Sequence, residues 1–315
     1  MCTCVRFSDN NGNMYFGRNL DWSTGFGERV VITPRAYRYH SPFRGELSPT
    51  YAVIGMGIVA DDVPLYFDCG NEKGLAVAGL NFPGYARYEP APLEGKVNIA
   101  AYEFPLWVAM SFATVDEVEE ALQDVALVDH PLDDTHPVSL LHWMVGDGKR
   151  SIVVEYTEAG MQVFHNGADV LANQPGYAWH RENLRNYMNL SSAFPEKASW
   201  GGAEMTAYGS GAMMRGLPGD YYSPSRFVRV AYLNTHYPCK EGEGENVSRL
   251  FHTLAGVAMI DGAAAMGNGD FERTVYTGGF SARTATYYWN TYDDPSIRSV
   301  ALADYAIDGS ELVTL

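Results

Sequence analysis

Cysteine is scarce in this sequence, and its few copies do not form a familiar ligand pattern. The 315 residues contain four cysteines, Cys2, Cys4, Cys69 and Cys239. No Cys-x-x-Cys pair occurs, which argues against a common redox motif or zinc ribbon. A small secreted domain held together by disulfides would carry many more cysteines. We therefore expect a reduced protein with no metal site and no disulfide framework.

Positive charge is also in short supply. The chain carries 22 Lys and Arg residues against 38 Asp and Glu residues, a formal net charge of −16. Such a balance argues against nucleic acid and against anionic membrane surfaces as partners. It also provides no long-range attraction for an anionic substrate, so we expect any such substrate to be bound through local contacts.

Long apolar runs are missing as well. No stretch of 18 apolar residues occurs, so the sequence predicts neither a transmembrane helix nor membrane anchoring. The first 20 residues include Arg6, Asp9 and Arg18 and lack an apolar segment, so we expect no signal peptide. Together with the reduced cysteines, this predicts a cytoplasmic protein.

The sequence does contain enough apolar material for a large core, at 46% of its residues. Blocks of strand-like segments are interleaved with pairs of helix-like segments, and no internal repeat or flexible linker separates them. This pattern predicts an α+β fold of two packed sheets covered by helices. We expect a single domain spanning residues 1–315.

Two sequence patterns resemble cofactor-binding motifs, but the residues around them argue against that function. Residues 55–60, Gly-Met-Gly-Ile-Val-Ala, have the spacing of a dinucleotide-binding loop. Residues 61–64, Asp-Asp-Val-Pro, predict a turn into a strand where that loop requires a helix. His130 and His136 lie beside prolines without further regular ligands, so we expect them at the surface. The sequence predicts no cofactor.

Cys2 directly follows the initiator methionine. Removal of Met1 would leave one residue that carries both a thiol and a free α-amino group. Because an α-amino group has a pKa of about 7.7–8.0, it can accept the thiol proton near neutral pH. The alternative is a small residue at a frayed chain end.

The residues after Cys2 predict a hairpin. Residues 3–7 alternate polar and apolar, residues 10–13 (Asn-Asn-Gly-Asn) predict a turn, and residues 14–18 predict the partner strand. This hairpin would bring Arg18 and Asp21 back to Cys2. A guanidinium there favours a thiolate, and a carboxylate could orient an ammonium group. The alternative is an ordinary surface ion pair.

Several segments together resemble one known family. They are Met-Cys-Thr-x-Val-Arg-Phe at 1–7, Tyr-Phe-Gly-Arg-Asn-Leu-Asp-Trp at 15–22, and the segments 66–72, 79–85, 173–175, 223–227 and 292–295. The sequence is similar to the choloylglycine hydrolase family, and most like its bacterial conjugated bile salt hydrolases. The resemblance covers essentially the whole chain. It implies the N-terminal nucleophile hydrolase fold, a four-layer αββα sandwich.

The resemblance also implies roles for three further residues. Asn81 matches the residue whose backbone N–H contributes to the oxyanion hole, and Asn173 matches the asparagine whose side-chain amide is the second donor. Arg226 matches an arginine that helps to order the site. Without the family resemblance, the sequence would indicate only that Asn81 and Asn173 are turn residues. The segment Ser223-Pro224 predicts a helix start with Ser223 as the N-cap, which places Arg226 in the first turn.

The implied reaction is hydrolysis of the amide bond of glycine- or taurine-conjugated bile salts through a Cys2 thioester. Asp21 would orient the α-amine, Arg18 would favour the thiolate, and no cofactor or metal would take part. A steroid requires an apolar pocket with few polar anchors. Leu20, Trp22, Phe26 and Ile58 are the candidate pocket residues, with plain core packing as the alternative.

Three other functions stay open at this point. A penicillin V acylase or another N-acyl amidase would share the fold, although those enzymes tend to carry an aromatic residue where Asn81 stands. A cysteine–histidine hydrolase is a second alternative, because eight histidines are available. The third is a steroid-binding protein without catalysis.

Residues 191–222 are rich in Gly, Ser, Ala and Met and have weak periodicity. Long segments of this kind inside compact domains are usually functional or interfacial. The resemblance implies an assembly role here, so we expect a homotetramer in which this segment makes contacts. Cys4 stands where related sequences often have a small residue, and it shares a strand face with Cys2.

Overall fold

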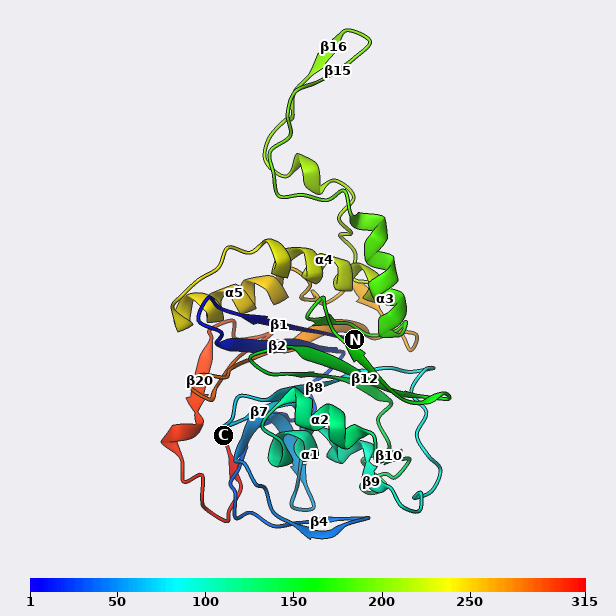
Figure 1. Cartoon of the computed structure of the whole chain (residues 1–315), viewed down its shortest axis with the longest axis vertical. Helices are drawn as coiled ribbons and strands as arrows, with labels where there is room; N and C mark the ends of the chain where they lie inside the picture. The colour runs from blue at the N-terminus through cyan, green and yellow to red at the C-terminus, as the bar shows by residue number, and fades with distance from the viewer.

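Two large sheets pack face to face in the computed structural model, which describes residues 1–315, and helices cover both outer faces (Figure 1). All strand pairs within these two sheets are antiparallel. The α+β, four-layer αββα architecture implied by the sequence is therefore confirmed.

The first sheet contains the N-terminal strand as the second strand from one edge. Its order is β14-β1-β2-β18-β19-β20, with β17 paired to β18. Its strands are β1 (Cys2–Ser8), β2 (Met14–Trp22), β14 (Val170–Leu171), β17 (Ala264–Ala265), β18 (Phe271–Ser281), β19 (Thr286–Thr291) and β20 (Arg298–Ala301).

The second sheet is built mainly from the first half of the chain. Its order is β13-β12-β11-β8-β7-β6-β3-β21. Its strands are β3 (Arg29–Thr33), β6 (Val53–Ala60), β7 (Val63–Asn71), β8 (Ala76–Asn81), β11 (Leu141–Gly146), β12 (Ser151–Thr157), β13 (Gly160–His165) and β21 (Val313–Thr314). The Gly-x-Gly segment at 55–60 lies within β6 and leads into β7, which excludes a dinucleotide loop.

Five α-helices form the outer layers. They are α1 (Phe104–Ser111), α2 (Val115–Leu122), α3 (Tyr177–Asn183), α4 (Ser223–His236) and α5 (Glu243–Ala255). α1 packs on β7 and β8 of the second sheet, whereas α4 and α5 pack on β1, β2 and β18 of the first. None of the helices combines the length and apolar character needed to cross a membrane.

Short elements complete the chain. Three two-stranded ribbons are β4 (Tyr39–Ser41) with β5 (Gly45–Leu47), β9 (Val97–Ala100) with β10 (Val125–Val128), and β15 (Ala198–Trp200) with β16 (Ala203–Met205). Four 3-10 turns are η1 (Ala101–Glu103), η2 (Leu184–Tyr187), η3 (Ala212–Met214) and η4 (Leu302–Asp304).

Alternating side chains give the sandwich two separate apolar layers. One includes Cys4, Phe16 and Leu80 between the two sheets, and it continues on the other face of the first sheet, where Val5 faces α4 and α5. The other includes Phe104 and Trp143, and lies between the second sheet and α1 and α2. Because both faces of the second sheet are covered, its strands are apolar on both sides, as the buried patterns of β6 and β8 show.

The first hairpin forms as predicted. Gly12 takes a positive φ of 80°, which a glycine adopts without strain, and the Asp9 carboxylate accepts hydrogen bonds from the N–H groups of Asn11 and Asn13. The pairing of β1 with β2 places Cys2 opposite Leu20. Local turn chemistry therefore determines which residues face Cys2.

The prediction that Ser223 caps α4 is wrong. The helix begins at Ser223 itself, its N-cap position is Tyr222, and no side chain caps it. The Ser223 hydroxyl is buried without a partner. The Asp220 carboxylate fixes the segment that leads into the helix, because it accepts hydrogen bonds from Tyr222 N–H and the Ser225 hydroxyl.

Two other helices have irregular ends. The Asn246 side chain donates to the Gly242 carbonyl in the first turn of α5, which ends at Ala255. α3 is followed by a 3-10 turn that ends at Tyr187.

Gly70 marks the tightest contact between the sheets and gives the first prediction. A Cβ at Gly70 in β7 would lie 2.6 Å from ring atoms of Phe280 in β18. We expect Gly70→Ala to lower the free energy of unfolding by about 1–3 kcal/mol through overpacking. Adding Phe280→Leu should recover part of the loss, because it removes ring atoms from the clash. Urea unfolding measures both variants.

The matched control is Gly167→Ala, because nothing lies within 4 Å of a Cβ at Gly167. An equal loss in Gly167→Ala and Gly70→Ala would show that a general effect of replacing glycine, rather than the contact between sheets, sets the cost.

Candidate active site

Arg18 lies beneath Cys2 between the two sheets. One guanidinium N–H donates to Cys2 Sγ at 2.6 Å, and another nitrogen donates to the carbonyl oxygens of Gly79 (2.9 Å) and Phe67 (3.2 Å). The Arg18 side chain is buried, with 1% of its surface exposed. A cation held against the sulfur favours its thiolate form. The structure thus brings together the two residues that the hairpin predicted.

Burial alone would lower the pKa of Arg18, but the neighbouring Cys2, Tyr276 and Asp68 raise it above the ordinary value. Arg18 therefore stays charged in the interior. Cys4 lies on the same strand face, and burial raises the pKa of its thiol well above the usual range. Cys4 is consequently a poor nucleophile compared with a thiol that contacts a guanidinium.

Asn173 lies two residues after β14 and contacts the backbone of Cys2. Its Oδ1 accepts a hydrogen bond from Cys2 N–H at 2.7 Å and one from the Arg226 guanidinium at 2.8 Å. Its Nδ2 donates to the carbonyl oxygen of Asn81 at 2.6 Å. Asn173 and Asn81 are therefore adjacent, although they come from different sheets.

The backbone N–H of Asn81 points away from the neighbouring strand β11. Asn81 pairs with Leu141, whose N–H donates instead to the Tyr88 hydroxyl at 2.8 Å. Phe82 N–H donates to the carbonyl of Leu140 at 2.7 Å. In an antiparallel ladder this alternation makes Asn81 and Leu141 a non-hydrogen-bonded pair, which leaves the Asn81 N–H free of β11.

Arg226 explains why a cation stands in the first turn of α4. Its guanidinium donates to the carbonyl oxygen of Cys2 at 2.5 Å and also to the Thr3 hydroxyl. A nitrogen of Arg226 lies 3.9 Å from the Asp21 carboxylate. Burial lowers the pKa of Arg226, and Asp21 and Cys2 oppose that change. These contacts with the β1 strand offset the unfavourable position near a helix N-terminus.

Asp21 is buried, and only one of its two carboxylate oxygens accepts a hydrogen bond. Its Oδ1 accepts a hydrogen bond from the Thr274 hydroxyl at 2.6 Å, whereas Oδ2 has no hydrogen-bond partner and lies 3.9 Å from the Arg226 guanidinium. Burial raises the pKa of Asp21, and Arg226 opposes that change. The free oxygen is available to a nearby donor. Met1 is present in the structure, and its ammonium group donates to the Asp21 backbone oxygen and to the Glu272 carboxylate at 2.8 Å.

Glu272, Thr274 and Phe67 were not predicted from the sequence. Glu272 and Thr274 lie on β18, which pairs with β2 across about 250 residues of sequence. No local signal identifies such a partner. Phe67 lies in the segment 66–72 that carries part of the family resemblance, which was the available signal.

Three of the four candidate pocket residues lie near Cys2. Leu20 is its cross-strand neighbour, and Trp22 follows on the same strand. The ring of Phe26 lies 6.2 Å from that of Trp22 and 5.6 Å from that of Phe67, centroid to centroid. Phe26 is 49% exposed, so an apolar wall reaches the surface here. Ile58 packs instead with the apolar layer under α1 and α2.

Histidine does not contact Cys2. The nearest histidine in the hydrogen-bond network is His180, whose Nε2 lies 2.8 Å from the backbone oxygen of Asn173. Because a carbonyl oxygen only accepts, Nε2 carries the proton. No group of three or more His, Cys, Asp or Glu side chains is placed to hold a metal ion.

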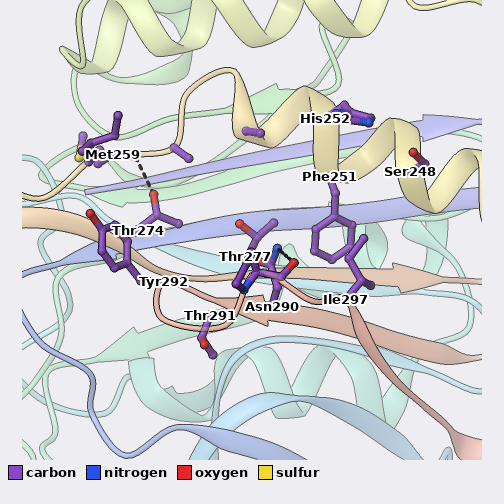
Figure 2. A pocket seen from close by; sticks show the side chains of 14 residues that line it. Ser248, Phe251, His252, Met259, Thr274, Thr277, Asn290, Thr291, Tyr292 and Ile297 are labelled. Atoms are coloured by element: carbon purple, nitrogen blue, oxygen red, sulfur yellow. Dashed lines mark hydrogen bonds between the residues drawn. The ribbon is translucent and has the colours of Figure 1, made fainter.

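Two surface cavities lie near the site without including Cys2. One of about 360 Å³ lies between α5, β18 and β19, and Figure 2 shows Thr274 on its wall, bonded to Met259. The other, of about 370 Å³, has Tyr276 and Trp289 in its lining. Thr274 connects the first cavity to Asp21, since its hydroxyl donates to that carboxylate.

His180 makes the stability of this region depend on pH. Burial lowers the pKa of His180 from 6.5 to about 4, so the folded chain holds it neutral. The unfolded chain takes up a proton below about pH 6.5, so the stabilisation present above that pH is lost between about 6.5 and 4. His180→Gln keeps an N–H donor but does not titrate. As the pH falls through this range, we expect the free energy of unfolding of this variant to decrease by about 1–3 kcal/mol less than that of wild type. Urea unfolding at pH 7 and 4.5 tests this.

The control is His40→Gln, because His40 is exposed and should behave as wild type. If His180→Gln and wild type lost stability in parallel as the pH fell, buried His180 would not be the titrating group.

Comparison with known proteins places the chain in a family. The family described as "Linear amide C-N hydrolases, choloylglycine hydrolase family" matches residues 2–315. A bile salt hydrolase/transferase of Bifidobacterium longum subsp. longum is 59% identical over 317 residues, which cover 100% of this chain and 99% of that protein.

Solved structures agree with this placement. The C2A mutant of a conjugated bile acid hydrolase from Clostridium perfringens superposes with a TM-score of 0.94 at 37% identity, over 100% of this chain and 96% of that one. A penicillin V acylase from Agrobacterium tumefaciens shares the fold, with a TM-score of 0.79 at 17% identity over 100% of this chain and 91% of that one. The chain therefore belongs to the choloylglycine hydrolase family, and it is an enzyme that hydrolyses linear amide bonds.

Proposed function

We propose that this enzyme hydrolyses the amide bond of glycine- or taurine-conjugated bile salts through a thioester on Cys2. The observation that carries the proposal is the 2.6 Å contact between the buried Arg18 guanidinium and Cys2 Sγ, with Asn173 bound to the Cys2 backbone. The names of the full-length relatives, bile salt hydrolase/transferase and conjugated bile acid hydrolase, support the substrate class.

The first step requires loss of Met1. The nitrogen of Cys2, now a peptide N–H bonded to Asn173, then becomes the free α-amine. This amine accepts the proton of the thiol, directly or through a water molecule, and the sulfur attacks the amide carbon of the substrate. Asn173 stays in contact with the amine, while the free oxygen of Asp21 provides a second acceptor that orients it.

The oxyanion is stabilised by the N–H of Asn81 and the side-chain amide of Asn173. Asn173 Nδ2 now donates to the Asn81 carbonyl, so its second N–H is the one available to substrate. Two such donors, one at the end of β8 and one two residues after β14, stabilise charge as it develops. Collapse of the tetrahedral intermediate breaks the C–N bond, and the leaving amine takes the proton held by the Cys2 amine. Water then hydrolyses the thioester, which restores the thiol.

Arg226 acts as a positioning residue in this scheme. It binds the carbonyl oxygen of Cys2 and Oδ1 of Asn173, and so fixes the nucleophile relative to the oxyanion donor. The proposed steroid pocket is formed by Leu20, Trp22 and Phe26. Ile58 contacts a different apolar layer, and the proposal does not require it.

The same proposal includes a cytoplasmic, single-domain enzyme that assembles as a homotetramer. Residues 191–222 support the assembly, because the β15–β16 hairpin projects far from the sandwich (Figure 1). Trp200 and Phe194 are 76% and 65% exposed on this segment. Exposed aromatic side chains on an extended arm are typical of a surface that a partner covers.

The nucleophile and substrate are tested together. We expect intact mass to show loss of Met1, and the wild type to hydrolyse glycocholate faster than penicillin V. Cys2→Ala should lose at least about 10³-fold of the turnover, because the reaction depends on a covalent intermediate. Cys239→Ala is the matched control, because Cys239 is the exposed cysteine and should leave activity unchanged.

Retention of Met1 in a fully active enzyme would overturn the role of the terminal amine. Faster hydrolysis of penicillin V would leave the thioester chemistry in place and make the enzyme an acylase. Bile salt binding without turnover, unchanged in Cys2→Ala, would indicate a binding protein.

The assembly is tested separately. We expect the double substitution Trp200→Asp and Phe194→Asp to dissociate the tetramer into smaller species, because buried charge at an interface is costly. Sedimentation velocity gives the result. Leu93→Asp, an exposed residue outside the arm, should sediment as wild type. A double variant that stays tetrameric would rule out the arm as the main contact.

A further inference from the structure

One buried carboxyl group near the site has no part in the mechanism above. Asp68 lies on β7, is 3% exposed and faces the interior between the two sheets. Its Oδ1 accepts a hydrogen bond from the Tyr276 hydroxyl at 2.5 Å, and its Oδ2 accepts one from the Tyr287 hydroxyl at 2.6 Å. Both tyrosines are fully buried.

The hydrogen bonds indicate that Asp68 is ionised. Each tyrosine hydroxyl has one proton, and neither has another acceptor within hydrogen-bond reach. Burial, together with the adjacent Asp68, raises the pKa of Tyr276 and of Tyr287 well above the usual range, so both keep their protons. A carboxylate that receives two donors has both oxygens satisfied, whereas a protonated carboxyl would donate to one hydroxyl oxygen and leave the proton of that tyrosine without an acceptor.

Asp68 is placed as the counter-charge of Arg18. No carboxylate lies within 4.0 Å of the Arg18 guanidinium, whose contacts are carbonyl oxygens and the Cys2 sulfur. One of those carbonyls belongs to Phe67, the residue before Asp68. The Arg18 guanidinium also lies 6.0 Å from the ring centroid of Tyr276, whose hydroxyl reaches Asp68.

The backbone leaves room for this cluster. Gly278 on β18 is the cross-strand partner of Arg18. A Cβ there would lie 2.2 Å from the Tyr287 hydroxyl and 3.1 Å from Asp68 Oδ2. Because Gly278 has no side chain, the Tyr287 hydroxyl and the Asp68 carboxylate can occupy the space beside the strand position opposite Arg18.

We propose that the Asp68 carboxylate, held by Tyr276 and Tyr287, balances the charge of Arg18 and thereby limits how strongly Arg18 favours the Cys2 thiolate. Asp68 is a positioning residue in this role, since it acts on the sulfur through Arg18. The inference rests on the proposed function of Cys2 as the nucleophile.

The groups that face this cluster come from several elements. They are Arg18 on β2, Tyr276 on β18, Tyr287 on β19, Cys4 on β1 and, on the far side of Cys2, Arg226 on α4. Burial raises the pKa of Asp68, while Arg18 and the two tyrosine hydrogen bonds oppose that change. Without the Asp68 charge, Arg18 and Arg226 would remain near the sulfur, and the negative charge that balances them would be smaller by one.

The test measures the thiol itself. Mature protein in a Cys239→Ser background is alkylated with iodoacetamide between pH 4 and 9, and peptide mass spectrometry counts label on Cys2. We expect Asp68→Asn to shift the midpoint of the pH profile about one unit lower, because loss of a nearby buried anion favours the thiolate by about tenfold. Tyr287→Phe, which removes one donor, should shift the midpoint the same way by a smaller amount.

Glu103→Gln is the matched control. Glu103 is also a buried carboxyl group, but it lies in the other apolar layer and accepts from Ala100 N–H at 3.0 Å. We expect this variant to lose stability without a shift in the Cys2 profile. If Asp68→Asn fails to fold, Tyr287→Phe decides the outcome.

An unchanged midpoint in the folded variants would overturn the proposal and leave Asp68 with a purely structural role. A midpoint shifted upward would also overturn it, because Asp68 would then act by holding Arg18 in place. Failure of the proposed function looks different: wild type would be alkylated at Cys2 with a defined midpoint and would not hydrolyse glycocholate.

Discussion

The rest of the structure depends on one buried cation, Arg18, which is held between two sheets with its guanidinium against the Cys2 sulfur. Transfer of an isolated charge from water to an apolar interior is very costly, so such a group must be compensated by many contacts. Carbonyl oxygens from β7 and β8 supply part of this compensation. The nearby Asp68 carboxylate is the counter-charge that we propose for this cation. The sandwich therefore has to close correctly before Arg18 can be accommodated.

The two proposed oxyanion donors, Asn81 and Asn173, impose a second constraint on the same interface. Asn173 follows β14 at one edge of the first sheet, and Asn81 ends β8 in the second. Their 2.6 Å hydrogen bond crosses between the sheets. The distance between the two donors is consequently set by sheet-to-sheet packing, and tight contacts such as the one between Gly70 and Phe280 hold that packing in place. Asn81 is fixed on a strand, and Asn173 is held by hydrogen bonds with Cys2, Arg226 and Asn81, which suits the proposed role of both residues in stabilising developing charge.

Strand β18 connects the site to the C-terminal half of the chain. Glu272 binds the N-terminal ammonium, Thr274 binds Asp21, and Tyr276 binds Asp68. A bulge between residues 274 and 276 shifts the register. Thr274 and Tyr276, which are two residues apart, therefore point to opposite faces of the sheet, where they bind Asp21 and Asp68. This strand also connects the site to the cavity in Figure 2, since Thr274 lies on its wall.

The amino-acid sequence by itself determined the local part of the site. Turn residues and alternation were sufficient to pair β1 with β2, and this register alone places Arg18 and Asp21 beside Cys2. The order of strand-like and helix-like segments was sufficient for the α+β class, and the family resemblance supplied Asn81, Asn173 and Arg226. Tertiary structure decided the rest. The partners of Asp21 and Asp68 lie more than 200 residues away, Ile58 packs on the opposite face of its sheet from the site, and α4 already begins at Ser223 with Tyr222 at its N-cap. These outcomes depend on strand order and on competition between neighbouring side chains, which no local pattern encodes.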